Sequence, residues 1–97
     1  MSEYRWDVDK NHRLAQERGV TFEDVLLAMD QGYLLDILQH PNQARYRHQK
    51  IFVVEIRQYV YLVPFVEQGD DIFLKTIIPS RTLTTRYQRR RQPDDET

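Results

Sequence analysis

Three strand-like runs joined by short links constrain the fold of this chain more than any other feature of its sequence. Each run is rich in aromatic and β-branched residues, which favour strands. The runs cover residues 51–56, 59–66 and 72–78, and the links between them cover residues 57–58 and 67–71. Because these links are too short for a crossover, consecutive strands must pair antiparallel. The sequence therefore predicts an antiparallel meander.

The links and one proline add detail to this meander. Arg57-Gln58 predicts a tight hairpin, although neither residue is the usual Gly or Asn. Gly69 in the second link suits a longer loop. Pro64 lies inside the second run and has no N–H to donate, so we expect a bulge or an unpaired position there. We interpret residues 59–66 as the central strand, with an edge that accepts a partner's strand as the alternative.

Capping signals predict two helices before the meander. Asp7 is a good N-cap and Gly19 suits the position after a helix end, so a mostly exposed helix of about three turns is expected between them. Thr21 begins a second helix, Asp24 gives it a weak capping box, and Gly32 ends it. Its apolar residues recur at helical spacing and form one buried face. They are Phe22, Val25, Leu26 and Met29.

Shorter segments complete the predicted order. An edge strand, a further strand, a turn and a loop are expected at residues 4–6, 34–38, 40–42 and 43–50 respectively. After Pro79, either Ser80 or Thr82 caps a final helix that carries Leu83 and Tyr87 on one face. The order β-α-α-β-β-β-β-α indicates an α+β domain, with helices segregated from a small, mainly antiparallel sheet.

The length and composition indicate one globular domain. The 97 residues are 40% hydrophobic and 30% charged, so we place a single domain at residues 1–92 and expect residues 93–97 to be a disordered tail. The absence of cysteine excludes disulfides and thiolate metal sites. No apolar stretch resembles a signal peptide or a bilayer-spanning segment. We therefore expect a cytoplasmic protein that does not contact a membrane.

The net charge of −1 hides an asymmetry along the chain. Residues 1–40 carry four basic and eight acidic side chains, a balance of −4. Residues 81–97 carry five arginines and three acids, a balance of +2, and the arginines come first. A basic surface is therefore expected near the C-terminus, where it would attract a polyanion or an acidic partner.

The residues that carry chemistry fit metal-independent cleavage of RNA. The histidines lack metal-ligand spacing, and no phosphate-binding glycine loop is present, so we expect neither a metal nor a cofactor. When the RNA 2′-OH attacks the adjacent phosphate, the reaction needs a base, an acid and cations that stabilise the phosphorane. The candidate catalytic residues are Lys75, Arg81, His48 and Glu55. The candidate RNA-binding residues are Lys50, Arg57, Arg86 and Tyr87.

Each candidate also has a structural interpretation. Lys75 alternates with Phe73 and Ile77, and can extend its amine from a partly buried strand. His48 can be a solvated loop residue, and Glu55 an outward-facing strand residue. The arginines at 89–91 can form a solvated or partner-facing extension of the last helix.

Three motifs in a fixed order are fairly specific in combination. Trp6-Asp7 is followed by Lys10, residues 18–24 read RGVTFED, and residues 77–81 read IIPSR before a basic helix. With this order, residues 4–90 resemble the BrnT family of bacterial toxins.

The resemblance implies a RelE-like fold, with two N-terminal helices packed on a small antiparallel sheet and a helix after it. It implies a type II toxin, a ribonuclease that inhibits translation. It also implies a cognate antitoxin, BrnA-like and of ribbon-helix-helix type, which neutralises the toxin and links the pair to operator DNA. Carried onto this chain, the basic residue at the end of the sheet is Lys75 and the strand-to-helix arginine is Arg81, with Arg86 and Tyr87 following. A non-catalytic module that binds nucleic acid or a partner through the same fold is the alternative.

Overall fold

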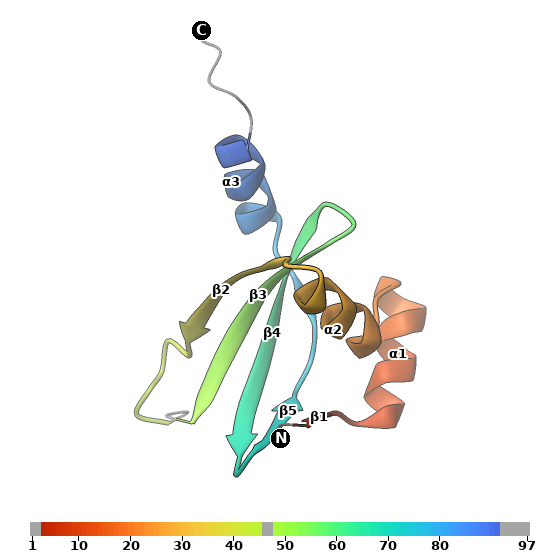
Figure 1. Ribbon diagram of the computed structural model, residues 1–97, viewed down its shortest axis with the longest axis vertical. Helices are drawn as coiled ribbons and strands as arrows, with labels where there is room; N and C mark the ends of the chain where they lie inside the picture. The colour runs from red at the N-terminus through yellow and green to blue at the C-terminus, as the bar shows by residue number, and fades with distance from the viewer. Residues whose placement is uncertain (1–2, 46–47, 92–97) are drawn as a thin grey trace, which may run out of the picture.

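The protein is a mixed sheet with three helices, seen in a computed structural model that describes residues 3–45 and 48–91 (Figure 1). The elements are β1 (Tyr4–Arg5), α1 (Val8–Arg18), α2 (Phe22–Asp30), β2 (Leu34–Gln39), β3 (Gln49–Ile56), β4 (Tyr59–Gln68), β5 (Asp71–Leu74), β6 (Ile78–Pro79) and α3 (Arg81–Arg91). The strand order is β1-β5-β4-β3-β2, with β6 also paired to β4. Only the β1–β5 pair is parallel among these ladders. The predicted α+β class and meander are confirmed, and β4 is central rather than an edge.

Both N-terminal helices begin and end where the capping signals place them, within one residue. The Asp7 carboxylate accepts from the N–H groups of Asp9 and Lys10, and Gly19 follows α1 in the left-handed region with φ 67°. In α2 the Thr21 hydroxyl accepts from the N–H of Asp24, whose carboxylate accepts from the N–H of Thr21. The predicted capping box is therefore complete.

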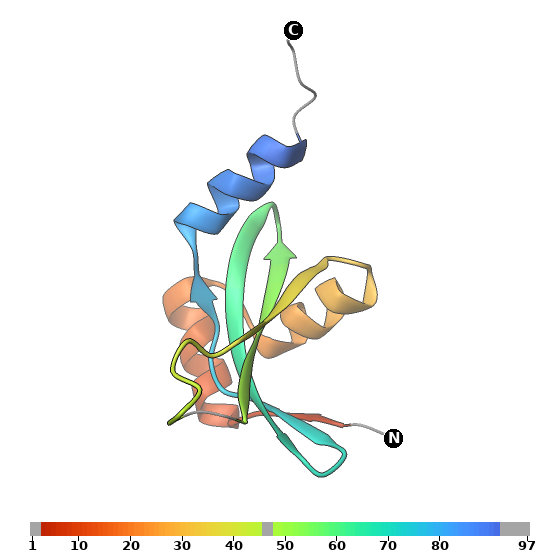
Figure 2. The same ribbon diagram turned by 90° about the vertical axis from the view of Figure 1, so that its left-hand side faces the viewer.

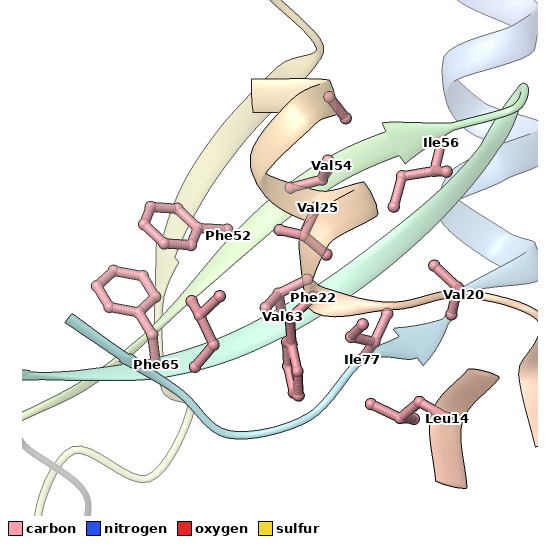
Figure 3. Close-up of a cluster of buried hydrophobic side chains, with 12 residues drawn as sticks. Leu14, Val20, Phe22, Val25, Phe52, Val54, Ile56, Val63, Phe65 and Ile77 are labelled. Atoms are coloured by element: carbon pink, nitrogen blue, oxygen red, sulfur yellow. The ribbon is translucent and has the colours of Figure 1, made fainter. Parts of the chain in front are cut away.

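The hydrophobic core lies between α2 and the sheet, and α1 adds a smaller contribution to it. Leu14 is the one buried residue of α1, whereas α2 supplies Phe22, Val25 and Ala28. Figure 3 shows Phe22 and Val25 of α2 beside Val54 of β3 and Val63 of β4. The rings of Phe52 and Phe65 stack there, with centroids 3.9 Å apart. An aromatic pair of this kind contributes about 0.5–1.5 kcal/mol beyond the area that it buries.

The β3–β4 hairpin turns on two residues that both adopt positive φ. Arg57 has φ 51° and Gln58 has φ 68°, the geometry that usually selects Asn-Gly. The Arg57 guanidinium donates to the carbonyl of Gly19 at 2.7 Å and lies 3.8 Å from the Asp24 carboxylate. These contacts tie the unfavourable turn to the start of α2.

The prediction of one strand over residues 72–78 is wrong, because the chain leaves the ladder after Leu74. The N–H of Lys75 donates to the carbonyl of Pro64 at 2.8 Å. Pro64 has no N–H with which to return a bond, and the β4–β5 pairing ends at this position. The unpaired position expected at Pro64 is thus confirmed, on the β5 side.

The strand β6 pairs with β4 again, in a register that is shifted by one residue from the β4–β5 pairing. Leu74 lies opposite Phe65, whereas Ile78 lies opposite Leu62, so one extra residue is accommodated between β5 and β6. The shift turns Ile77 into the core, where it is fully buried. Ile77 therefore does not share a face with Lys75, as the alternating pattern had suggested. The guanidinium of Arg18, in the last turn of α1, donates to the carbonyl of Ile77 and fixes this irregular segment.

The strand β2 forms one edge of the sheet and carries a bulge at its start. Its register against β3 shifts between Leu34 and Asp36. The Asp36 carboxylate accepts from the N–H of Ile37 at 2.8 Å. The loop predicted over residues 43–50 is shorter than expected, because β3 begins at Gln49. Residues 46–47 of that loop, and the predicted tail at 93–97, lie outside the described residues.

The final helix extends away from the sheet, as Figures 1 and 2 both show. It packs mainly against β4, and Gln88 donates a hydrogen bond to the carbonyl of Gln58 in the β3–β4 hairpin. Within residues 3–45 and 48–91, no helix has the length and apolar character needed to cross a membrane.

Candidate nucleic-acid interface

The first turn of α3 is fixed to the central strand by hydrogen bonds. The Ser80 hydroxyl accepts from the N–H of Leu83 at 3.2 Å, which is the predicted cap. The N–H of Ser80 donates to the carbonyl of Val60 at 2.9 Å. The buried Thr84 hydroxyl accepts from the N–H of Val60 at 2.8 Å and donates to the carbonyl of Ser80 at 2.7 Å. The five residues SRTLT, from Ser80 to Thr84, therefore supply both the cap and the buried hydroxyl that hold the helix in place.

One side of α3 is a continuous cationic surface, which we call the arginine face. It surrounds a shallow, open depression of about 570 Å³. Its members form two rows with a spacing of four residues, so they lie on one side of the helix. The first row is Arg81, Thr85 and Arg89, and the second is Thr82, Arg86 and Arg90.

The arginine face carries unbalanced positive charge. The α3 segment RTLTTRYQRRR contains no acid, and none of Arg81, Arg86, Arg89 and Arg90 forms an ion pair with another described residue. Successive members of a row are about 6 Å apart along the axis, from the 1.5 Å rise per residue. Exposed guanidinium groups at such spacing, interleaved with threonine hydroxyls, suit a chain of phosphates.

Two of the sequence-predicted residues belong to this face and one lies beside it. Arg81 and Arg86 are exposed members. Tyr87 is half-buried on the side towards the sheet, with the Arg90 guanidinium 5.3 Å from its ring centroid. That contact occupies Tyr87 as a cation–π partner within the helix.

Lys75 lies apart from α3, in the irregular segment between β5 and β6. Its side chain is exposed, with the amine 5.6 Å from the ring centroid of Phe73. Lys75 is hydrogen-bonded to Pro64 and Pro79 is paired with Tyr61. These two β4 positions are three residues apart, roughly 10 Å along a strand. Lys75 therefore lies in the segment that precedes α3 and not beside the first turn of that helix.

His48 and Lys50 lie at the far end of β3. His48 is exposed just before the strand, and the Lys50 amine lies 3.5 Å from the Glu67 carboxylate. Lys50 and Glu55 are five positions apart, roughly 16 Å along the strand. The structure thus does not bring His48 and Lys50 together with Arg81.

Glu55 and Arg57 lie near the base of α3 but have structural partners. Glu55 is buried, at 7% exposed, and pairs in register with Val60, the residue that α3 is bonded to. Arg57 holds the hairpin to Gly19 and Asp24, as described above. Of the eight predicted residues, Glu55, Arg57, Arg81, Arg86 and Tyr87 therefore lie at this end of the sheet.

Four members of the arginine face were not among the predicted site residues: Thr82, Thr85, Arg89 and Arg90. The helical spacing of Arg81, Thr85 and Arg89 was present in the sequence and would have identified the row. Among the described residues, no group of three or more potential ligands is placed to hold a metal ion.

Comparison with known proteins adds no relative. No model of a known protein family matches the chain, and no curated protein matches it in sequence.

Proposed function

We propose that this protein binds RNA through the arginine face and acts as the toxin of a bacterial type II toxin–antitoxin pair. In this proposal it is a metal-independent endoribonuclease of BrnT type, with a RelE-like fold, that inhibits translation. The observation that carries the RNA-binding part is the set of four arginines on one side of α3 that form no ion pair within residues 3–45 and 48–91. The toxin assignment is supported by the order of motifs, from Trp6-Asp7 to Ser80-Arg81, and by the α+β arrangement that contains them.

Electrostatics favour a polyanion on this face. Each arginine that neutralises a phosphate releases condensed counterions, so affinity depends steeply on salt. The fork geometry of a guanidinium also matches phosphate oxygens in a way that lysine does not. RNA is preferred as the substrate over DNA because cleavage without a metal requires the 2′-OH as nucleophile.

For catalysis, Arg81 is the best-placed cation. It begins α3 beside the hydrogen-bonded junction of Ser80, Thr84 and Val60, so its backbone position is fixed. A cation carried on a fixed backbone position needs less reorganisation to stabilise the phosphorane. The β6 strand separates the Lys75 backbone from the first turn of α3. In this proposal Lys75 therefore contacts a part of the RNA next to the part that Arg81 contacts.

The separation of His48 and Lys50 from α3 favours a second candidate function, an RNA-binding module without cleavage. In both cases a ribbon-helix-helix antitoxin would neutralise the protein and connect it to operator DNA. Cleavage distinguishes the two candidates. Purified protein should degrade a labelled RNA in EDTA, and expression without a partner should arrest growth. If folded protein binds RNA yet leaves it intact in EDTA, the module is correct and the ribonuclease is not.

Substitution of the arginine face tests the binding itself. Arg86→Gln and Arg90→Gln should each weaken RNA binding and flatten the plot of log affinity against log salt by about 0.7, the loss of one phosphate contact on a single strand. Arg13→Gln is the matched control, because Arg13 is an exposed arginine on α1. Equal effects of all three substitutions would refute a role for the arginine face. For catalysis, Arg81→Gln should reduce cleavage more than binding.

A further inference from the structure

The exposed apolar side chains at the C-terminal end of α2 form a surface that the proposed RNA site does not use. Leu27 is 55% exposed, Tyr33 47% and Ile37 50%. Leu27 and Tyr33 line a pocket of about 270 Å³ whose other apolar walls are Ala28 and Ile56. Ile37 lies further along β2, paired with the core residue Phe52 and so on the same side of the sheet as α2. We call Leu27, Tyr33 and Ile37 the α2–β2 patch.

Carboxylates surround the most exposed member of this patch. Asp24 and Asp30 lie three residues before and after Leu27, which places all three on neighbouring positions of one helix side. Asp24 also lines the pocket, where its carboxylate lies 3.8 Å from the Arg57 guanidinium, so Asp30 is the carboxylate beside Leu27 that forms no ion pair within the described residues. An apolar stripe bordered by acids is complementary to an apolar stripe bordered by bases.

Asp30 is in a position that the isolated domain does not favour. It is the last residue of α2, where the helix dipole presents partial negative charge, and no basic residue lies in that last turn. Among the described residues Asp30 forms no ion pair. A partner's lysine or arginine at this point would meet Asp30 and the helix end together.

The free edge of β2 is unsuited to pairing with a partner's strand. The N–H of His40 points to β3, where it is bonded to Gln49, so the N–H of Ile37 points outward. That outward group is already bonded to the Asp36 carboxylate. The bulge between Leu34 and Asp36 also breaks the register that an added strand would follow. Such devices protect an edge from strand addition.

The described part of this chain supplies no suitable occupant of its own. The outward side of α3 is basic but carries only arginines and threonines, so it has no apolar stripe to bury. Two copies meeting patch to patch would bring Asp24 and Asp30 of each copy together, and like charges oppose that contact.

From these features we infer that the α2–β2 patch docks an amphipathic helix of a partner protein, with lysines or arginines on both sides of an apolar stripe. One apolar side chain of that helix enters the pocket beside Leu27, and one basic side chain reaches Asp30. This docking does not depend on RNA binding, because the patch and the arginine face share no residue.

A pair of helical peptides tests this inference on the full-length protein. The first is a labelled peptide of about 18 residues, five turns, with a leucine stripe bordered by lysines. The second has the same stripe bordered by glutamates. Fluorescence anisotropy in about 50 mM salt should show binding of the lysine peptide, weakened about tenfold by Leu27→Ser and about threefold by Asp30→Asn. Val8→Ser, at an equally exposed apolar residue of α1, is the matched control and should change nothing.

Three outcomes would overturn the inference. The first is lysine-peptide binding that is absent or unaffected by Leu27→Ser, with circular dichroism showing the variant folded. The second is equal binding of the glutamate peptide with the same sensitivity to Leu27→Ser. The third is a wild-type dimer in sedimentation velocity that Leu27→Ser converts to monomer, since a second copy would then occupy the patch. Because no RNA is present, failure here leaves the RNA-binding proposal intact, and Arg86→Gln should not weaken the lysine peptide.

Discussion

The attachment of α3 depends on one buried hydroxyl, which can be removed without changing the shape of the side chain. Thr84→Val keeps the β-branched outline but deletes the Oγ1 that accepts from the N–H of Val60 at 2.8 Å. Val60 is buried, so its N–H is left without an acceptor, which costs about 1–3 kcal/mol. The carbonyl of Ser80 still accepts a hydrogen bond from the N–H of residue 84, at 3.0 Å. The substitution therefore leaves only one buried polar group, the N–H of Val60, without a partner. We therefore expect a loss of about 2 kcal/mol in the free energy of unfolding.

Urea denaturation followed by circular dichroism measures this loss, with an unchanged slope and a lower midpoint. In a thermal scan the same loss lowers Tm by roughly 10 °C for a domain of this size. Thr85→Val is the matched control, one residue along the same helix but exposed, and should change stability by no more than about 0.5 kcal/mol. The reasoning is refuted if Thr84→Val is as stable as the wild type, or if Thr85→Val costs as much.

Three further predictions concern the frame that supports the two proposed surfaces. Gln58→Gly should stabilise the protein by about 0.5–1 kcal/mol in urea, because glycine adopts the observed φ of 68° without steric cost; a destabilised variant would contradict this. Arg18→Gln should cost about 1–3 kcal/mol by leaving the carbonyl of Ile77 without its donor, and a neutral result would show that water replaces the guanidinium. The hydrogen bond that Asn11 donates to Glu23 lowers the pKa of that carboxyl, so its stabilisation is present at neutral pH and fades as the pH falls through the folded pKa. Asn11→Ala should therefore destabilise the protein more at neutral pH than in acid, as urea midpoints at several pH values would show, and an equal loss throughout would exclude the charge contribution.

Local sequence signals predicted those features of the fold whose causes lie within a few residues. Asp7 and Gly19 bound α1, Thr21 and Asp24 cap each other, and Ser80 caps α3, because each contact joins neighbours in the chain. The Arg57-Gln58 turn was also predicted, although it lacks glycine, because the apolar runs on either side left only two residues for it.

The features that sequence reasoning missed depend on contacts between distant residues. The split between β5 and β6 arises where Pro64 meets Lys75, and proline's effect on a neighbouring strand is visible only once the register is known. Arg18 and Ile77 are 59 residues apart, and no pattern in either segment indicates their contact. For the candidate site, Arg89 was set aside although its spacing from Arg81 matches the helical repeat. Lys75 was predicted to share a face of the sheet with Ile77, because the alternation of side chains in a regular strand was assumed to continue through the irregular segment between β5 and β6.

The two halves of α3 are subject to different constraints. The first half holds the Ser80 cap and the buried Thr84, so a change there alters the folding of the whole domain. The hydrogen bonds described for the second half reach the body only through Gln88, which donates to the carbonyl of Gln58 at 3.5 Å. Charge at Arg89 and Arg90 can therefore be added, removed or reversed with little effect on stability. Affinity for a polyanion is free to change in small steps within this half of the helix, while the scaffold that presents it stays constant.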